Sequence, residues 1–205
     1  MRPSKIVCVG RNYAEHAREL GNAVPERPLL FFKPPSAIIP PGAAIVLPAA
    51  SSQVEHEAEI GVVIGRRLSR ASAEQAEAGI GGFTCVNDVT ARDLQKTDGQ
   101  WARAKGFDTF CPTGPAVVPG LDWRTLEVIG RVNGVERQRG TTSQMIFDIP
   151  RVLAYISAVM TLEPGDLVAT GTPAGVGPLA DGDVVEVEIP GVGVLSNPVR
   201  SERSS

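Results

Sequence analysis

The chain has 205 residues, of which 42% are hydrophobic and 21% charged, and its formal net charge of −3 offers no basic face for nucleic acid or an anionic membrane. This composition is ordinary for a globular protein, so we expect one domain over residues 1–205 with a frayed tail at 200–205. No apolar run reaches the roughly 18 to 20 residues that span a bilayer, and the three cysteines, an odd number without metal-ligand spacing, are typical of reduced thiols in a cytoplasmic protein.

Glycine and proline residues, 22 and 17 in number, are spread along the chain, which is typical of a turn-rich β protein. In the N-terminal half, apolar runs predict strands. Two stretches predict helices, the first ended by Gly21 and the second opened by a capping box of Ser72 and Gln75. A helical turn with Thr90 as its N-cap follows the last of these strands. The strands are expected over 5–10, 29–32, 44–48, 59–65 and 83–89, and the helices over 12–20, 72–80 and 90–95.

The C-terminal half carries stronger local signals. The dipeptide Asn133-Gly134 between alternating apolar residues predicts a β-hairpin. Asp148 is a suitable cap for an amphipathic helix, and alternating valines predict a closing hairpin. Since strands predominate and helices are short, the sequence predicts an α+β fold, predominantly β. The C-terminal elements are expected over 126–140, 148–160 and 182–199.

Three glutamates alternate at the start of one predicted strand: Glu55, Glu57 and Glu59. Residues i and i+2 of a strand point to the same face, so these carboxylates form one row at the mouth of an apolar strand. Because an unpaired buried charge is costly, the row either faces water as a solvated strand end or carries a cation. Asp88, at the end of a second apolar strand, favours the cation. Two glutamates and an aspartate form the all-oxygen set that Mg²⁺, Mn²⁺ or Ca²⁺ prefers.

Five segments follow one another as motifs along the chain: "VGRNYAEHARELG", "HEAEIGVVIG", "VNDVTARDLQ", "GQWARAKGFDTFCPTGP" and "LVATGTPAGVGP". With them the chain resembles the fumarylacetoacetate hydrolase family. It is most similar to the short, single-domain branch of acylpyruvases, oxaloacetate decarboxylases and 2-hydroxyhepta-2,4-diene-1,7-dioate isomerases. The resemblance implies a mixed β-sandwich roll around one Mg²⁺ or Mn²⁺ held by Glu57, Glu59 and Asp88, and usually a homodimer. Glu55 then lies outside the ligand set, as a solvated strand-end residue.

The resemblance also implies which cations hold the substrate. Three carboxylates around a doubly charged ion leave a local charge of −1, so an anionic substrate needs further positive charge. Lys105 and Arg92 stand at matching motif positions and supply it, with Arg11 as a third candidate. Each of the three, taken alone, also fits an ordinary surface cation.

Polar groups that carry no charge complete the expected binding site. Gln95 is placed to hydrogen-bond a substrate oxygen. Gly171 and Thr172 resemble the family's carboxylate-binding loop, in which a Gly-rich turn offers backbone N–H groups to an anion. By itself this loop also fits an ordinary turn after a strand. Gly106 stands where many relatives carry Ser, so a hydroxyl contact to substrate is missing here.

His16 and Glu19 lie at positions i and i+3 of the first predicted helix, on one face. Such a pair acts as a general base toward water when the carboxylate orients the imidazole ring, although the spacing also fits an exposed structural pair. The resemblance implies the first of these, because in acylpyruvase-like relatives this helix, within residues 1–21, is a lid over the substrate. His56 faces away from the carboxylate row and is expected to be structural.

These features predict a metal-dependent hydrolase that cleaves a C–C bond in an acylpyruvate-type 2-oxo acid through a metal-stabilised pyruvate enolate, with Lys105 steadying the oxyanion. Two alternatives stay open because one site supports them as well: oxaloacetate decarboxylation, which gives the same enolate, and 2-hydroxyhepta-2,4-diene-1,7-dioate isomerisation in aromatic catabolism, in which a metal-bound dienol is reprotonated elsewhere. The His16–Glu19 pair favours hydrolysis, since isomerisation needs no activated water. A non-enzymatic binding protein is the competing class. The presence of the metal ligands, of Lys105 and of the His16–Glu19 pair argues against it. Neither a nucleophilic serine motif nor a phosphate-binding glycine loop occurs.

Overall fold

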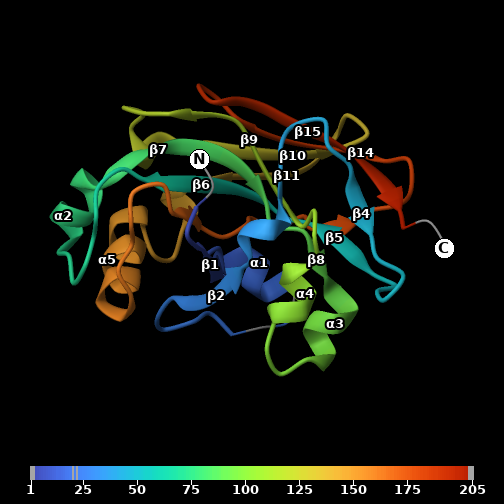
Figure 1. Cartoon of the computed structure of the whole chain (residues 1–205), viewed down its shortest axis with the longest axis horizontal. Coiled ribbons are helices and arrows are strands. Elements are labelled where there is room, and N and C mark those ends of the chain that lie inside the picture. The colour runs from blue at the N-terminus through green and yellow to red at the C-terminus, as the bar shows by residue number, and fades with distance from the viewer. Residues whose placement is uncertain (1–2, 20, 22, 203–205) are drawn as a thin grey trace.

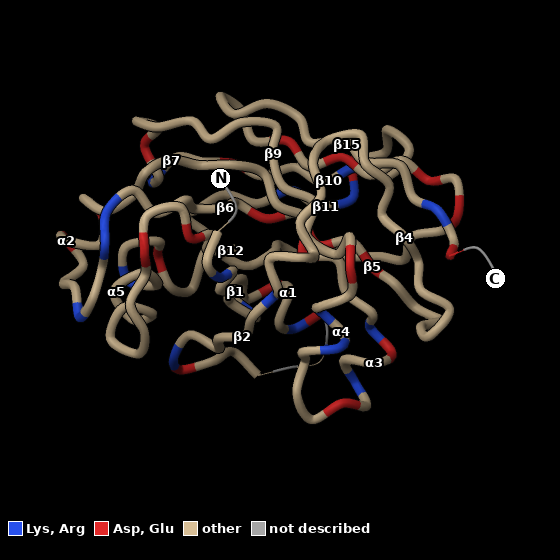
Figure 2. Tube along the Cα trace, in the orientation of Figure 1, with Lys and Arg blue, Asp and Glu red and all other residues tan. Residues whose placement is uncertain are grey.

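Figure 1 shows the computed structural model of the protein, which describes residues 3–19, 21 and 23–202. Strands make up most of the regular structure and form a large sheet, a second sheet that packs over it, and a small sheet beside two short helices. The predicted α+β, predominantly β class is therefore confirmed. Within the described ranges, no helix is long and apolar enough to cross a membrane. Acidic and basic residues are interspersed along the chain in the view of Figure 2.

The large sheet has seven strands in the order β2-β1-β12-β6-β7-β9-β3. At its centre β6 pairs antiparallel with β7, and β1 runs parallel to β12 although the two are far apart in the sequence. Because parallel strands end at the same edge, the segments that follow β1 and β12 become neighbours. The strand bounds are β1 Ile6–Gly10, β2 Leu29–Lys33, β3 Ile38–Ile39, β6 Ala58–Ile64, β7 Ile80–Asn87, β9 Cys111–Val118 and β12 Leu167–Ala169.

The second sheet has five strands in the order β11-β10-β14-β15-β4, and the small sheet has three in the order β13-β5-β8. The two predicted hairpins, β10–β11 and β14–β15, form most of the second sheet. The bounds are β4 Ile45–Leu47, β5 Val54–His56, β8 Thr90–Ala91, β10 Glu127–Val132, β11 Val135–Thr141, β13 Gly177–Pro178, β14 Val184–Ile189 and β15 Gly193–Ser201.

The main core lies between the two larger sheets. Ile60 and Val62 of β6 point into it at alternate positions, where they join one buried cluster with Val128 of β10 and Val187 of β14. Leu153 of α5 belongs to the same cluster, so that helix closes one end of the core (Figure 1). The helices are α1 Ala14–Glu19, α2 Ala73–Ala78, α3 Arg92–Thr97, α4 Ala102–Gly106 and α5 Ile149–Val159, with 3₁₀ turns at Pro35–Ala37, Trp123–Thr125 and Thr142–Gln144.

The local signals of the sequence are confirmed at several element ends. Asn133 and Gly134 both adopt positive φ angles, 53° and 76°, as the tight hairpin turn requires. The Ser72 capping box is present at α2, and the Asp148 side chain accepts the Arg151 N–H at the start of α5.

Two local predictions are wrong. Thr90 is not an N-cap: it pairs with Glu55 in the small sheet, and α3 begins two residues later with Ala91 as its N-cap. The tail does not begin at residue 200, because Arg200 and Ser201 continue β15 and pair with β4. Residues 203–205 lie outside the described part. In both cases a strand partner distant in sequence extends the regular structure beyond what the local pattern predicts.

Candidate active site

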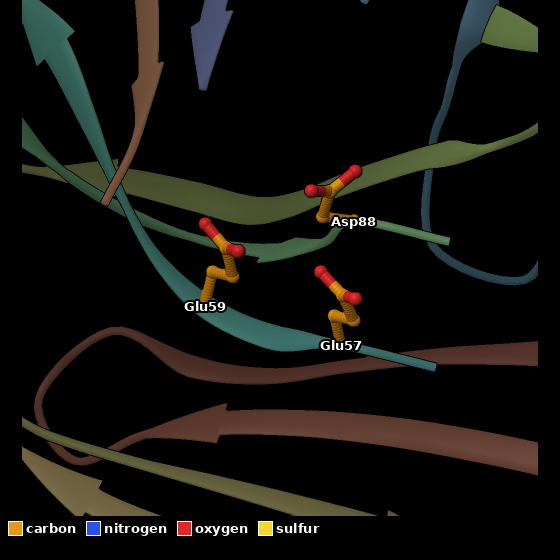
Figure 3. Close-up of side chains that lie close together, drawn as sticks. All are labelled: Glu57, Glu59 and Asp88. Atoms are coloured by element: carbon orange, nitrogen blue, oxygen red, sulfur yellow. The ribbon is translucent and has the colours of Figure 1, made fainter. Parts of the chain in front are cut away.

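Two neighbouring strands bring the predicted carboxylates together. Glu59 lies on β6 opposite Val86 of β7, and Glu57 immediately precedes β6. β7 ends at Asn87, so Asp88 leaves the sheet beside Glu57, and its N–H donates to the Glu57 carbonyl at 2.8 Å. Figure 3 shows the three side chains turned toward one another, and one oxygen of each lies within 4.8 Å of the others.

All three carboxylates are buried, with 4% of Glu57, 2% of Glu59 and none of Asp88 exposed. Burial raises the pKa of Glu59 well above its usual value, and the charges of Asp88 and Glu57 raise it further. Among the described residues, the only hydrogen-bond donor to the Glu59 carboxylate is the Gly171 N–H, 2.8 Å from Oε2. The cluster therefore lacks positive charge at Glu59. A divalent cation that prefers oxygen ligands fits this donor set.

Lys105 of α4 is a buried cation that contacts two of the three carboxylates. Its Nζ donates to Glu57 Oε2 at 2.8 Å and to Asp88 Oδ2 at 2.7 Å. Burial favours the neutral amine, but attraction to Asp88 and Glu57 outweighs it and raises the pKa of Lys105. Burial likewise opposes ionisation of Glu57, but Lys105 and Arg92 hold the pKa of that carboxyl below its usual value. The structure thus brings Lys105 to the carboxylates as a charged group.

A second buried lysine, Lys33 at the end of β2, was not found from the sequence. Its side chain has no exposed surface, and its Nζ donates to Asp88 Oδ1 at 2.5 Å and to the Val89 carbonyl at 2.9 Å. Asp88 therefore has a lysine on each of its oxygens. The only signal for Lys33 in the sequence is that it follows the apolar run "LLFF". A lysine at such a position can be either buried or exposed at the end of a strand.

Arg92 is held by two glutamates, and this corrects the interpretation of Glu55. The guanidinium donates through Nε to Glu55 Oε2 at 2.7 Å, through Nη2 to Glu57 Oε1 at 2.6 Å and through Nη1 to Gln95 Oε1 at 2.6 Å. Glu55 is only 6% exposed. It is therefore not a solvated strand-end residue: β8 and Arg92 cover it, and the arginine neutralises its charge.

The predicted binding loop, Gly171 and Thr172, forms hydrogen bonds to β6, the strand that carries Glu59. Gly171, at φ 103°, directs its N–H to Glu59, and the Thr172 hydroxyl donates to the Ala58 carbonyl at 2.9 Å. That hydroxyl also accepts from Gln138 Nε2 at 2.7 Å. The Gly171 N–H and the Thr172 hydroxyl are thus used within the protein, so the Gly171 N–H is not free for an anion as the motif suggested. Thr172 nevertheless lines the pocket described below.

The predicted His16–Glu19 pair forms on α1. His16 Nδ1 lies 3.2 Å from Glu19 Oε2, and the Gly175 N–H donates to the Glu19 carboxylate at 3.0 Å. His16 is only 4% exposed and lines the same pocket as the three carboxylates. His56 lies elsewhere, buried with its Nδ1 3.0 Å from Gln138 Oε1, where that oxygen accepts the imidazole proton. This position agrees with a structural role for His56.

These groups line one pocket, whose volume is about 390 Å³ and is partly open to solvent. His16, Lys105, Arg92, Gln95 and Thr172 line it together with the carboxylates, while Glu19 and Gly171 contact the lining residues from outside. Phe31, Trp101 and Arg11 also line the pocket, beside Val9 and Gly10. The sequence alone does not identify Phe31 and Trp101 as pocket residues, because aromatic residues in strands and turns also occur in cores.

A family model and a solved structure both match nearly the whole chain. The family model described as fumarylacetoacetate (FAA) hydrolase C-terminal matches residues 5–200. The X-ray structure of 5-carboxymethyl-2-hydroxymuconate delta-isomerase from Mycobacterium smegmatis superimposes with a TM-score of 0.93 at 50% identity, covering 100% of this chain and 81% of that one.

Two curated relatives carry names that refer to oxaloacetate. The mitochondrial oxaloacetate decarboxylase of Dictyostelium discoideum is 43% identical over 195 residues, which cover 92% of this chain and 89% of that protein. The mitochondrial oxaloacetate tautomerase FAHD2A of Bos taurus is 44% identical over 210 residues, which cover 97% of this chain and 67% of that protein. These relatives and the M. smegmatis structure thus carry names for three different reactions.

Proposed function

The chain belongs to the fumarylacetoacetate hydrolase family, and from this premise we propose that it is a metal-dependent hydrolase that cleaves a C–C bond in an acylpyruvate-type 2-oxo acid. The observation that carries the proposal is the arrangement of one pocket: a buried carboxylate cluster, a charged lysine and a histidine–glutamate pair all border it. A non-catalytic binding protein has no need of a histidine–glutamate pair in its pocket.

Glu57, Glu59 and Asp88 would hold one Mg²⁺ or Mn²⁺. Their oxygens lie close enough together to share an ion, and Glu59 lacks a cationic partner within the described residues. When bound, the ion supplies Lewis-acid chemistry, because it stabilises negative charge on oxygens of the substrate's 2-oxo acid end. The surrounding charge supports this assignment: among the described residues, the four buried carboxylates at the cluster, Glu55 included, outnumber the three buried cations Lys33, Arg92 and Lys105 by one.

The remaining residues orient the substrate and move protons. In hydrolysis, His16 takes a proton from water while Glu19 holds the ring through Nδ1, and the water oxygen attacks the carbonyl carbon farther from the carboxylate. Lys105 stabilises the oxyanion that results. The C–C bond then breaks, its electron pair remains with pyruvate as the enolate, and protonation at C3 completes the products, a carboxylic acid and pyruvate.

Arg92 and Gln95 act on this reaction by position. Nε, Nη1 and Nη2 of Arg92 each already donate to an acceptor within the protein. The arginine therefore contributes mainly a fixed positive charge at the pocket wall. The Gln95 carbonyl is used by Arg92, which leaves its amide group to donate to a substrate oxygen. Gly171 keeps the Glu59 carboxylate in place, and Thr172 forms the adjacent wall.

Decarboxylation or tautomerisation of oxaloacetate is the second candidate. The names of the D. discoideum and B. taurus relatives favour it. Loss of CO₂ from oxaloacetate leaves the pyruvate enolate, whereas loss of a proton from its C3 leaves the enolate of oxaloacetate itself, and neither step needs an activated water. Isomerisation, the reaction in the name of the M. smegmatis structure, uses the same enolate chemistry.

A panel of 2-oxo acids distinguishes these reactions. Acetylpyruvate, fumarylpyruvate, oxaloacetate and 2-hydroxyhepta-2,4-diene-1,7-dioate are assayed with Mg²⁺ and with Mn²⁺, with products identified by NMR. We expect kcat/KM to be larger for an acylpyruvate than for the other substrates. A larger value on oxaloacetate with none on acylpyruvates would replace the first candidate by the second. We also propose a homodimer, by family resemblance, which light scattering tests directly.

A further inference from the structure

Gln138 of β11 is not among the residues that line the pocket, yet its side chain is bonded to the loop that forms one of the pocket's walls. Only 1% of the residue is exposed, and its amide group uses its full hydrogen-bonding capacity. Oε1 accepts the Ala58 N–H at 2.9 Å and the proton of His56 Nδ1 at 3.0 Å. Nε2 donates to Thr172 Oγ1 at 2.7 Å and to the Pro173 carbonyl at 2.8 Å.

Backbone groups fix the orientation of this amide. The Ala58 N–H can only donate, so the oxygen of Gln138 faces it. The Pro173 carbonyl can only accept, so the nitrogen of Gln138 faces that side. Because both ends of the amide are determined, the side chain has one position, and it joins the loop to β6 and to β11 at the same time.

The loop that Gln138 holds reaches the histidine–glutamate pair two residues after Pro173. The Gly175 N–H donates to both oxygens of the Glu19 carboxylate, at 3.0 Å and 3.2 Å. Gly175 has φ 99°, and a Cβ at this position would stand 2.0 Å from the Arg137 carbonyl oxygen. The loop therefore lies directly against β11 at the residue before Gln138, and only glycine fits there.

Glu19 needs this support because its side chain is not enclosed. The Glu19 side chain is 34% exposed, whereas that of His16 is 5% exposed, and the pair is joined by the single 3.2 Å contact between Oε2 and Nδ1. A partly exposed glutamate has several rotamers, and only some of them reach the ring. Within the described part of the chain, Gly175 is the only other hydrogen-bond donor to this carboxylate. Its N–H therefore keeps Glu19 turned toward His16.

We propose that Gln138 is a positioning residue for the His16–Glu19 pair. It fixes the loop at Pro173, and the loop carries the Gly175 N–H to Glu19. Glu19 in turn keeps the proton of the imidazole on Nδ1, which leaves Nε2 of His16 to accept a proton from water. This inference rests on the proposed function, because it takes the pair to activate water. Since Gln138 does not line the pocket, it acts on the reaction only through the loop.

Two amide-to-carboxyl variants of the full chain test this role. Gln138→Glu keeps the shape of the side chain and its acceptor oxygen, but it cannot donate to both loop partners. Asn197→Asp is the matched control, because Asn197 is also 1% exposed and its Nδ2 donates to the Pro40 and Ala43 carbonyls, at 2.9 and 2.8 Å, outside the pocket.

Kinetics with Mg²⁺ or Mn²⁺ give the first measurement. In Gln138→Glu we expect kcat for acylpyruvate hydrolysis to fall about 10-fold or more while KM changes less than about 3-fold, because the variant loses orientation of the base and no substrate contact. Oxaloacetate decarboxylation, in which no water attacks, should fall less than about 3-fold. Asn197→Asp should leave both reactions within about 2-fold of wild type.

Nitrogen NMR of the histidine rings gives a second measurement that needs no turnover. The chain has only two histidines, so His16→Ala removes one set of ring signals and thereby assigns the other. At a pH where both rings are neutral, we expect wild type and Asn197→Asp to hold the His16 proton on Nδ1. Gln138→Glu should instead show the mixed tautomers of a ring without a fixed partner.

A double-mutant cycle separates an effect through Glu19 from general damage. If Gln138 acts through Glu19, adding Gln138→Glu to Glu19→Ala protein should lower hydrolysis by no more than about 2-fold. Gly175→Ala displaces the loop from β11 without altering Gln138. It should reproduce the loss of hydrolysis and of the single His16 tautomer, and it takes the place of Gln138→Glu if that variant does not fold.

Three results would count against these ideas in different ways. Folded Gln138→Glu protein that keeps the wild-type kcat, or that still holds His16 in one tautomer, overturns the role of Gln138. A loss in the Glu19→Ala background as large as that in wild type does the same, because Gln138 would then act by another route. If wild-type protein hydrolyses no acylpyruvate, the proposed function fails, and the NMR comparison still decides whether Gln138 positions the pair.

Discussion

The Lys33 ammonium group lies 2.5 Å from Asp88 Oδ1, and the two side chains are 0% and 1% exposed. Lys105 approaches the other oxygen of the same carboxylate at 2.7 Å. Asp88 is thus held on both sides by lysines from β2 and α4, and its orientation toward Glu57 and Glu59 depends on both elements.

Replacing Lys33 by Met, which preserves the length of the side chain, should destabilise the protein by about 3–5 kcal/mol, because it leaves the Asp88 charge with one cation instead of two. Urea unfolding measures this loss. Added Mn²⁺ should recover part of the stability if it replaces the missing charge. Lys96→Met, at an exposed position of α3, is the matched control and should change stability by less than about 0.5 kcal/mol. Equal stabilities of the two variants would contradict a role for Lys33 in holding Asp88.

Replacing Glu59 by Gln should weaken Mg²⁺ and Mn²⁺ binding at least about 10-fold, the scale of losing a charged ligand contact. It should also raise the melting temperature of metal-free protein at neutral pH, since a buried amide avoids the cost of either ionising Glu59 or holding it protonated above its usual pKa. Calorimetric metal titration and thermal melts in EDTA measure the two effects. Glu26→Gln, at an exposed position, should change neither. Full catalytic activity of EDTA-treated wild-type protein would refute the metal site altogether.

Replacing His16 by Ala should lower hydrolysis of acylpyruvates by roughly 10²-fold or more, the usual contribution of a general base. Oxaloacetate decarboxylation should fall much less, because no water attacks in that reaction. Oxalate and metal binding should remain, as measured by calorimetry. An equal loss in both reactions would assign His16 to the shared enolate step, and a loss of metal binding would make it a ligand or a structural residue.

Asp166 provides a pH test away from the pocket. Burial opposes its ionisation, but hydrogen bonds from Lys5, Ser4 and the Glu163 N–H outweigh burial and lower the pKa of its carboxyl. A depressed pKa contributes stability that is present above the unfolded value of about 3.9 and lost as pH falls through the folded value. Asp166→Asn should therefore be less stable than wild type at neutral pH, and the gap should narrow below about pH 4. A gap that is constant with pH, in urea unfolding, would contradict this account.

The sequence predicts the parts of the molecule whose signals are local or belong to a contiguous motif. The Asn133-Gly134 hairpin is a local signal, and the cluster of Glu57, Glu59 and Asp88 comes from two short motifs at strand ends. Lys33 and Glu55 could not be assigned, because their burial depends on Asp88 and Arg92, which lie 55 and 37 residues away along the chain. An alternating pattern predicts which side of a strand a carboxylate is on, but not what covers that side.

The parallel pairing of β1 with β12 has a consequence for the order of events during synthesis. Ile6 pairs with Leu167, so β1 has no parallel neighbour until the chain up to about Leu167 has left the ribosome. The Arg11–Asn12 turn has to wait for the same late segment, because Asn12 bonds to Thr170 and Phe147. Closing such long loops is slow. The pocket is therefore one of the last parts of the nascent protein to assemble, and a truncated chain that contains all three carboxylates still lacks the binding site.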